Sequence, residues 1–216
     1  KPYNKKVPYH RYYKATMQVE APDYYIVPQA WNGVVQRLKA NGVEMVPLKK
    51  DTALRVSSYY IRNYDSRNQP YEGHYYHRSV ELEERRQKRA FLQGDMVVPV
   101  DQKQNRYIVH VLEPRARDSF FAWNFFDEVL QQKEWFWPYV FEPMARKILA
   151  RRPELKQAFE QKRSRDSTFG GSNWRQLYFI YERSKYYEEE HNRYPVAGIE
   201  AGRIEPLIAP GSPLEN

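Results

Sequence analysis

The chain has no cysteine, so its 216 residues cannot form disulfides, thiolate zinc sites or cysteine nucleophiles. No run of about 18 apolar residues occurs, and we therefore expect no membrane span. A glycine-rich phosphate loop is also missing, because the one glycine pair, Gly170-Gly171, is expected only to break the chain between two helices. Lys1 does not open a charged-then-apolar leader, so we expect any signal peptide to have been removed or to lie upstream.

Basic and aromatic residues are abundant. The formal net charge is +8 with a pI of about 9.4, which permits an anionic partner without identifying one. Most basic residues occur in short groups interleaved with glutamate, a pattern typical of a solvated surface. No helix-turn-helix, zinc-finger or RNP-type signature accompanies the charge, and nucleic acid is therefore not an expected partner.

The first 50 residues predict a strand–helix–strand unit. Apolar residues alternate with polar ones over 11–20, and the apolar run Tyr24 to Val27 ends at a proline, so both segments are predicted strands. Helical spacing from Trp31 to Leu38 is followed by Asn41-Gly42 as a stop signal, and 43–48 is again extended. Such a unit is expected to pair its strands in parallel.

The rest of the chain predicts strands and then helices. Strands are expected over 52–61, 74–84 and 91–100, while Pro143 and Pro153 each suit the first position of a helix. The fold class is therefore α+β, with a mixed β-sheet that contains a small βαβ unit and with packed helices in the second half. We expect one domain at 11–196, a leading segment at 1–10 that follows a preceding domain, and a loose tail at 197–216.

The densest aromatic stretch runs from Leu112 to Trp137. Large aromatic rings bury about 150–250 Å² each, so a cluster of this size either fills the core or covers a partner. We expect it to do both, and we name its members as interface or ligand-surface candidates: Asp118, Phe120, Phe121, Trp123, Phe125, Phe126, Trp135 and Trp137.

The same stretch resembles the C-terminal region of long bacterial members of the carboxypeptidase A-like zinc peptidase family. The similar segments are Leu112-Glu113-Pro114, Asp118 to Phe126, Gln132-Lys133-Glu134, Tyr139 to Ala145, Tyr25 to Pro28, Leu38 to Glu44, Tyr71 to His74 and Lys1-Pro2-Tyr3. The resemblance covers most of the chain, to about Tyr181. In such proteins this region follows the peptidase domain.

The resemblance implies a metallopeptidase parent that removes C-terminal residues from peptides. Its zinc would be held by a His-x-x-Glu pair and a distant histidine, with a separate glutamate activating the water and an arginine gripping the substrate carboxylate. All of these would lie before Lys1, so this chain would be a non-catalytic accessory domain that contains no cofactor. It would pack on the peptidase domain and border the peptide-substrate cleft, in a secreted or periplasmic protein.

Two sets of residues inside the chain have metal-ligand character. His110 and Glu113 form a His-x-x-Glu pair with His191 downstream, yet the pair is predicted on the polar side of a helix, where a hydrated surface pair is the ordinary outcome. His74 and His77 are three positions apart, and on a strand this odd spacing directs them to opposite faces. We therefore expect neither set to bind zinc, and His74 and His77 join the interface or ligand-surface candidates.

Two further alternatives remain. Ser119 lies in no Gly-x-Ser-x-Gly elbow and is expected to shape a turn after Pro114, rather than to act as a nucleophile. Adjacent tyrosine pairs, such as Tyr24-Tyr25 and Tyr59-Tyr60, would place one ring on each sheet face. The outward rings could serve a stand-alone binding module for an anionic polymer or a cell-wall glycan.

Overall fold

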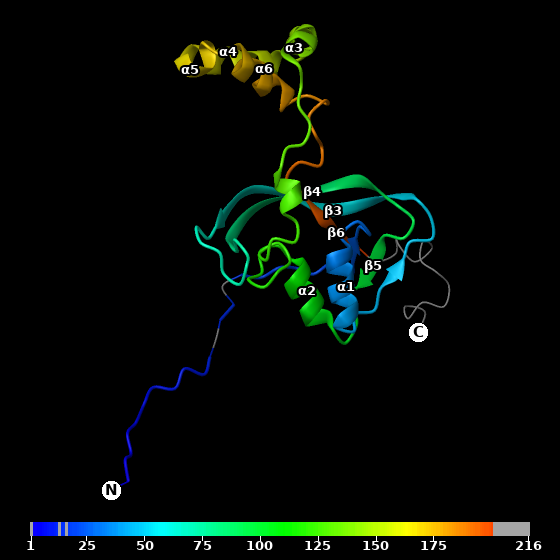
Figure 1. The fold of residues 1–216 in the computed structure, drawn as a ribbon, viewed down its shortest axis with the longest axis vertical. Coiled ribbons are helices and arrows are strands. Elements are labelled where there is room, and N and C mark those ends of the chain that lie inside the picture. Colours follow the sequence, from blue (N-terminus) through cyan, green and yellow to red (C-terminus); the bar gives the residue numbers. More distant parts are fainter. Residues whose placement is uncertain (1, 13, 16, 201–216) are drawn as a thin grey trace.

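The computed structural model describes residues 2–12, 14–15 and 17–200, which form an extended leading segment and two packed units (Figure 1). The sheet unit contains all six strands together with helices α1 and α2. The helical unit contains helices α3 to α6 and lies apart from the sheet (Figure 1). Two segments, 131–137 and 182–192, connect the two units, and we call them the neck.

The sheet has the strand order β2-β5-β1-β6-β3-β4. The strands are β1 (Tyr24–Val27), β2 (Val46–Pro47), β3 (Thr52–Ser66), β4 (His77–Phe91), β5 (Met96–Pro99) and β6 (Arg193–Ile199). Strands β3 and β4 form a long hairpin, and every pairing between described strands is antiparallel. Together with the helices this sheet confirms the α+β class.

The predicted strand–helix–strand unit is present as β1, α1 (Asn32–Ala40) and β2, but its strands are not neighbours. Strand β5 lies between them and pairs antiparallel with both, through Ile26 and Val46 to Val97. The expected parallel pairing is therefore wrong. Strand β5 takes this central position because its two valines are fully buried on opposite faces of the sheet. Val98 packs in one core and Val97 in the other.

Both faces of the sheet are buried, since neighbouring residues of a strand point to opposite sides. In β1, Tyr25 and Val27 join the first core, whereas Ile26 joins the second. Helix α1 and helix α2 (Asn105–Leu112) cover the first core. The second core consists of Ile26, Val46, Leu48, Leu54, Val56, Phe91, Val97, Ala197 and Ile199.

The helical unit has its own core. Its helices are α3 (Pro138–Arg151), α4 (Pro153–Arg165), α5 (Ser167–Gly170) and α6 (Asn173–Tyr181). They enclose Phe141, Ala145, Phe159, Phe169, Leu177, Ile180 and Tyr181. Pro153 begins α4 as expected, and the Ser172 hydroxyl accepts the amide hydrogen of Arg175 to cap α6.

The prediction that Pro143 begins a helix is wrong. Helix α3 begins five residues earlier at Pro138, and Pro143 lies inside it. The first position is taken by the earlier proline, whose missing N–H is not needed there. Pro143 instead leaves the carbonyl of Tyr139 without its usual intrahelical donor, at a position still close to the start of the helix.

The neck segments are bound to each other by side chains. The Glu188 carboxylate accepts the backbone N–H groups of Lys133 at 2.7 Å and Glu134 at 3.1 Å. At the sheet end, Asn192 donates its N–H to the carbonyl of Val129 at 2.7 Å, next to the 3₁₀ helix η1 (Asp127–Leu130). The chain therefore leaves the sheet unit and returns to it at adjacent points.

The ends of the chain differ from expectation. The strand predicted over 11–20 is not formed by the residues described there, because no neighbouring strand pairs with this exposed segment. Residues 197–199, expected in the tail, complete β6 between β1 and β3; residues 201–216 of that tail lie outside the described part. The domain at 11–196 stays a prediction, and within it the apolar residues divide between the two units.

Candidate functional site

The aromatic stretch divides between the core and the surface. Phe120, Phe121 and Phe126 are buried in the first core, and Trp123 and Phe125 are half-buried beside it. Phe126 meets Trp31 and Tyr194 edge-on, with ring centroids 4.9 and 5.0 Å apart. The part of the stretch before η1 therefore belongs to the sheet unit's interior.

The remainder of the stretch contributes exposed rings to the neck, and with nearby rings of the helical unit we call them the aromatic face. Its exposed members are Trp135 (58% exposed), Trp137 (72%), Tyr139 (76%) and Trp174 (46%). The half-buried rings of Phe136 and Tyr178 both lie against Trp174, and Tyr178 also lies against Trp135. Single exposed apolar residues are ordinary, but several large rings together indicate an interaction surface.

Among the described residues, ring contacts hold Trp135 and Trp174 in place, but none involves Trp137 or Tyr139. The Trp174 ring stacks on Tyr178 with centroids 5.0 Å apart, and Trp135 lies 6.1 Å from Trp174. The Tyr178 hydroxyl donates to Gln132 Oε1 at 2.8 Å, which ties the neck to α6. A pre-ordered set of rings loses little side-chain entropy when a partner covers it.

The three low-priority metal candidates are not brought together. His110 Nε2 lies 3.7 Å from a carboxylate oxygen of Asp118 at the surface, whereas Glu113 is buried. His191 lies in the neck, where its ring contacts the Tyr187 hydroxyl and the Leu130 carbonyl. Among the described residues no group of three potential ligands could hold a metal ion.

Glu113 instead anchors a buried polar cluster that the sequence did not reveal. The Tyr25 hydroxyl donates to its carboxylate at 2.5 Å, and the Tyr59 hydroxyl lies near enough to lower the pKa of that carboxyl. Burial raises the pKa of Glu113, while the two tyrosine hydroxyls and Arg115 oppose that rise. Burial also raises the pKa of Tyr25 above its ordinary value, and the adjacent Glu113 charge adds to the effect.

A groove opens beside this cluster. It has a volume of about 840 Å³ and is lined by residues 18–23 of the leading segment, by Tyr59 and Glu113, and by cations that include Arg55, Lys88 and Arg115. Acidic Glu84 and Glu200 line it too. The mixed charge of the rim favours no single ligand class.

The raised pKa of Glu113 gives a prediction for stability against pH. A carboxyl whose pKa rises on folding contributes its stability below the unfolded pKa, and that contribution is lost as the pH rises through the folded pKa. We expect wild type to lose stability relative to Glu113→Gln between pH 4 and pH 8, as measured by urea unfolding. The control Glu128→Gln changes an exposed carboxylate, so its stability relative to wild type should vary little with pH. The same flat pH dependence for Glu113→Gln would contradict the prediction.

His74 and His77 occupy different environments, and His74 lies outside strand β4, which begins at His77, so the opposite-face argument for a shared strand does not apply. His74 packs edge-on against Trp123. His77 is buried, with Nδ1 2.6 Å from the Ser66 hydroxyl and Nε2 2.9 Å from Asp127. A hydroxyl, an imidazole and a carboxylate in series can activate a nucleophile, but the His77 ring lies against Phe121 and joins the hairpin to η1. Asp127 is 50 residues from His77 in the sequence, so no local sequence pattern could predict this contact.

Asp118 and Ser119 shape the turn after Pro114. The Ser119 hydroxyl donates to the Pro114 carbonyl and accepts the N–H of Ala122, as a turn-forming role requires. The Asp118 side chain is exposed and lies between Trp123 and His110. Both residues therefore have structural contacts that account for their positions.

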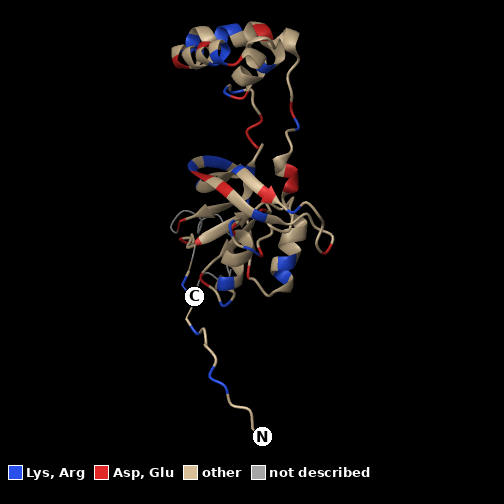
Figure 2. Cartoon of the chain, turned by 90° about the vertical axis from the view of Figure 1, so that its left-hand side faces the viewer, with Lys and Arg blue, Asp and Glu red and all other residues tan. Residues whose placement is uncertain are grey.

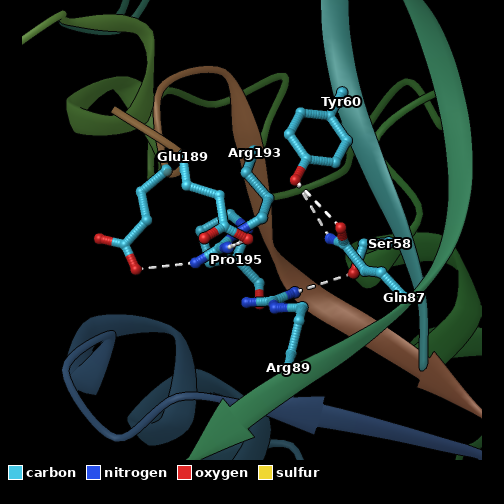
Figure 3. A network of polar contacts seen from close by, with 8 residues as sticks. Ser58, Tyr60, Gln87, Arg89, Glu189, Arg193 and Pro195 are labelled. Atoms are coloured by element: carbon cyan, nitrogen blue, oxygen red, sulfur yellow. Dashed lines mark hydrogen bonds and ion pairs between the residues drawn. The ribbon is translucent and has the colours of Figure 1, made fainter. Parts of the chain in front are cut away.

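A second network joins three strands of the sheet (Figure 3). Buried Arg89 of β4 donates to the Ser58 hydroxyl of β3 at 3.2 Å and to the Pro195 carbonyl of β6 at 3.1 Å. Burial, followed by the nearby charge of Arg193, lowers the pKa of Arg89 to about 10. Arg193 itself is held by Glu189 and Glu190 of the neck.

No helix in the described part of the chain combines the length and apolar character that a membrane crossing requires. Comparison with protein-family models, curated proteins and solved structures finds no match to this chain.

Proposed function

We propose that the chain is a non-catalytic accessory domain of a zinc metallocarboxypeptidase-like protein, and that the aromatic face docks on the peptidase domain. The observation that carries the proposal is the aromatic face itself, where Trp135, Trp137 and Tyr139 are each more than half exposed. Of its residues, Tyr139 falls within a segment that resembles the C-terminal region of such peptidases, and Trp135 and Trp137 lie between two such segments. The peptidase activity, its zinc and the peptide substrate would all belong to the parent protein.

The position of the face supports docking to a neighbouring domain. The helical unit stands away from the sheet unit, so the approach of a second domain is not obstructed by the sheet (Figure 1). Aromatic residues are enriched at the energetic centres of interfaces, where one ring can contribute 2 kcal/mol or more, on the order of a thirtyfold change in affinity. A docked domain would thus gain affinity from few side chains.

The alternative of a stand-alone glycan or anionic-polymer module depends on outward tyrosines. Of the pair Tyr59-Tyr60, Tyr60 is buried and Tyr59 is half-buried next to Glu113. Tyr12, Tyr75 and Tyr186 of other pairs are exposed, but among the described residues none of the three contacts another exposed ring as Trp135 contacts Trp174. We place docking first for this reason.

The native polypeptide provides the first test. An antibody raised against this chain would recover it from the source organism for peptide mapping upstream of Lys1, zinc analysis and hydrolysis of C-terminally free and blocked peptides. We expect an upstream peptidase domain, stoichiometric zinc and cleavage of free C termini only. A native polypeptide without a peptidase domain would refute the proposal.

The second test removes the rings. We expect Trp135→Ala/Trp137→Ala to weaken binding of the chain to the isolated peptidase domain by about tenfold or more, because both rings would be covered in the complex. Isothermal titration calorimetry measures the change. The control Tyr71→Ala/Tyr75→Ala removes two rings of similar exposure from the sheet unit and should bind like wild type; equal losses for both pairs would place the interface elsewhere.

A further inference from the structure

A second cavity, with a volume of about 740 Å³, lies between the leading segment and helix α2. Small-molecule sites in proteins have volumes of about 300–1,000 Å³, so this cavity is large enough for a ligand. The leading segment extends from the sheet unit on the side away from the helical unit (Figure 2). Of the described residues, none from the helical unit or the aromatic face lines the cavity, which is therefore a separate candidate site.

The walls of the cavity are mainly aliphatic. Met17, Val19 and Ala21 alternate with polar residues along the leading segment, so the side of this segment that faces the cavity is apolar. Val109 of α2 and Val100, which follows β5, contribute further apolar surface. The alternating pattern that predicted a strand over 11–20 thus supplies an apolar wall, although the residues described there pair with no strand.

The leading-segment wall is held by few polar contacts. Among the described residues, no hydrogen bond involves the backbone of residues 17–22. Met17 lines the cavity and is still 57% exposed. This wall can therefore move toward a ligand without breaking hydrogen bonds, and covering Met17 would remove apolar surface from water.

Positive charge predominates in the lining. Four of the lining residues are cations: Lys14, Arg106, Arg115 and Arg117. All four are exposed, and none forms an ion pair with a carboxylate among the described residues. His110 also lines the cavity, with Asp118 as its partner. The leading segment has the same sign of charge, because residues 2–15 contain four lysines and arginines and no aspartate or glutamate (Figure 2).

Glu113 is the one acidic residue of the lining, and it limits the charge that a ligand can carry. Its carboxylate accepts the Tyr25 hydroxyl, which belongs to the neighbouring groove and not to this cavity. Burial raises the pKa of Glu113, which favours its neutral form and reduces repulsion of an anion. A singly charged carboxylate therefore suits the cavity better than a doubly charged phosphate.

We infer that this cavity binds an aliphatic carboxylate, a ligand with an apolar chain and a single anionic head. The chain would cover Met17, Val19 and Val109. The head would be held by the cations of the lining, since the planar guanidinium of arginine matches the geometry of a carboxylate. This inference goes beyond the proposed function and applies with or without a peptidase domain.

The test titrates the whole chain by isothermal titration calorimetry with three probes that share a ten-carbon chain. The probes are decanoate, decyl phosphate and decyltrimethylammonium, each below the concentration at which it forms micelles. We expect decanoate to bind at one site and decyltrimethylammonium to bind at least about tenfold more weakly, because its head has the wrong charge. Decyl phosphate should also bind more weakly than decanoate.

Two variants test the two parts of the cavity. Arg106→Gln/Arg117→Gln should weaken decanoate binding by about tenfold, because it removes charge-assisted hydrogen bonds to the head. Met17→Gln keeps the length of an exposed side chain but makes it polar, and should weaken decanoate binding by about fivefold. Both variants change exposed side chains, so the fold should be retained, as circular dichroism would show.

A matched control removes two arginines elsewhere. Arg151→Gln/Arg175→Gln neutralises two exposed arginines of the helical unit and should bind decanoate like wild type. Equal weakening by the control and by Arg106→Gln/Arg117→Gln would overturn the inference. So would the absence of saturable decanoate binding, or binding of decyltrimethylammonium or decyl phosphate as tight as that of decanoate.

Discussion

Phe126→Ala is expected to destabilise the sheet unit by about 3–5 kcal/mol, the usual cost of truncating a fully buried phenylalanine. The ring is completely buried between Trp31 and Tyr194, in the core covered by α1 and α2. Its removal would leave a cavity at the point where the strand β6, the helix α1 and the aromatic stretch meet. Urea unfolding followed by circular dichroism measures the loss.

The control comes from the same stretch of sequence. Trp137→Ala removes a larger ring, but this ring is 72% exposed, so its removal should change stability by no more than about 0.5 kcal/mol. Comparable losses for the two variants would show that the division of the stretch into core and surface is wrong.

Arg89→Ala is expected to cost about 2–4 kcal/mol, because a buried acceptor left without its donor costs about 1–3 kcal/mol. The substitution leaves the Pro195 carbonyl and the Ser58 hydroxyl without the guanidinium, and it also removes packing against the Phe91 ring. Arg89→Met should recover part of the loss, since it keeps the packing and buries no charge.

Thermal and urea unfolding of the three proteins would rank them as wild type, Arg89→Met and Arg89→Ala. Lys88→Ala on the same strand is the control, because Lys88 is exposed and its loss should stay within about 0.5 kcal/mol. A loss for Arg89→Ala no greater than that of Lys88→Ala would contradict the structural role assigned to the guanidinium.

Strand β6 shows why part of the fold escaped prediction. Pro195 and Gly198 interrupt the sequence of β6, and both residues normally argue against a central strand. The β3–β6 register shifts between Ser58 and Tyr60, close to Pro195, and Arg89 bonds the Pro195 carbonyl there. At Gly198 a Cβ would lie 3.1 Å from Pro22, so the close approach of the leading segment favours glycine. Both causes are contacts with distant residues.

Local signals suffice where residues close in the sequence decide the structure. Helix α6 follows from its apolar spacing, from the Gly170-Gly171 break and from the Ser172 cap, all within 12 residues. The alternating pattern over 11–20 is equally regular, but a strand also needs a partner strand, which periodicity cannot supply. Phe126 and Trp137 belong to one aromatic run, yet Phe126 is buried and Trp137 is exposed. The difference depends on the part of the molecule that each residue joins, which the local sequence does not reveal.

The adjacency of the two neck segments also bears on how such a molecule could have arisen. Because Asn192 bonds directly to Val129, the ends of the intervening 62 residues meet at a single hydrogen bond of 2.7 Å. Because the sheet unit brings residues 129 and 192 together by itself, it would tolerate gain, loss or replacement of residues 130–191. Domains tolerate insertions at exposed loops for the same reason. The helical unit then has the character of a cassette, free to diversify its surface while the host sheet and its register stay unchanged.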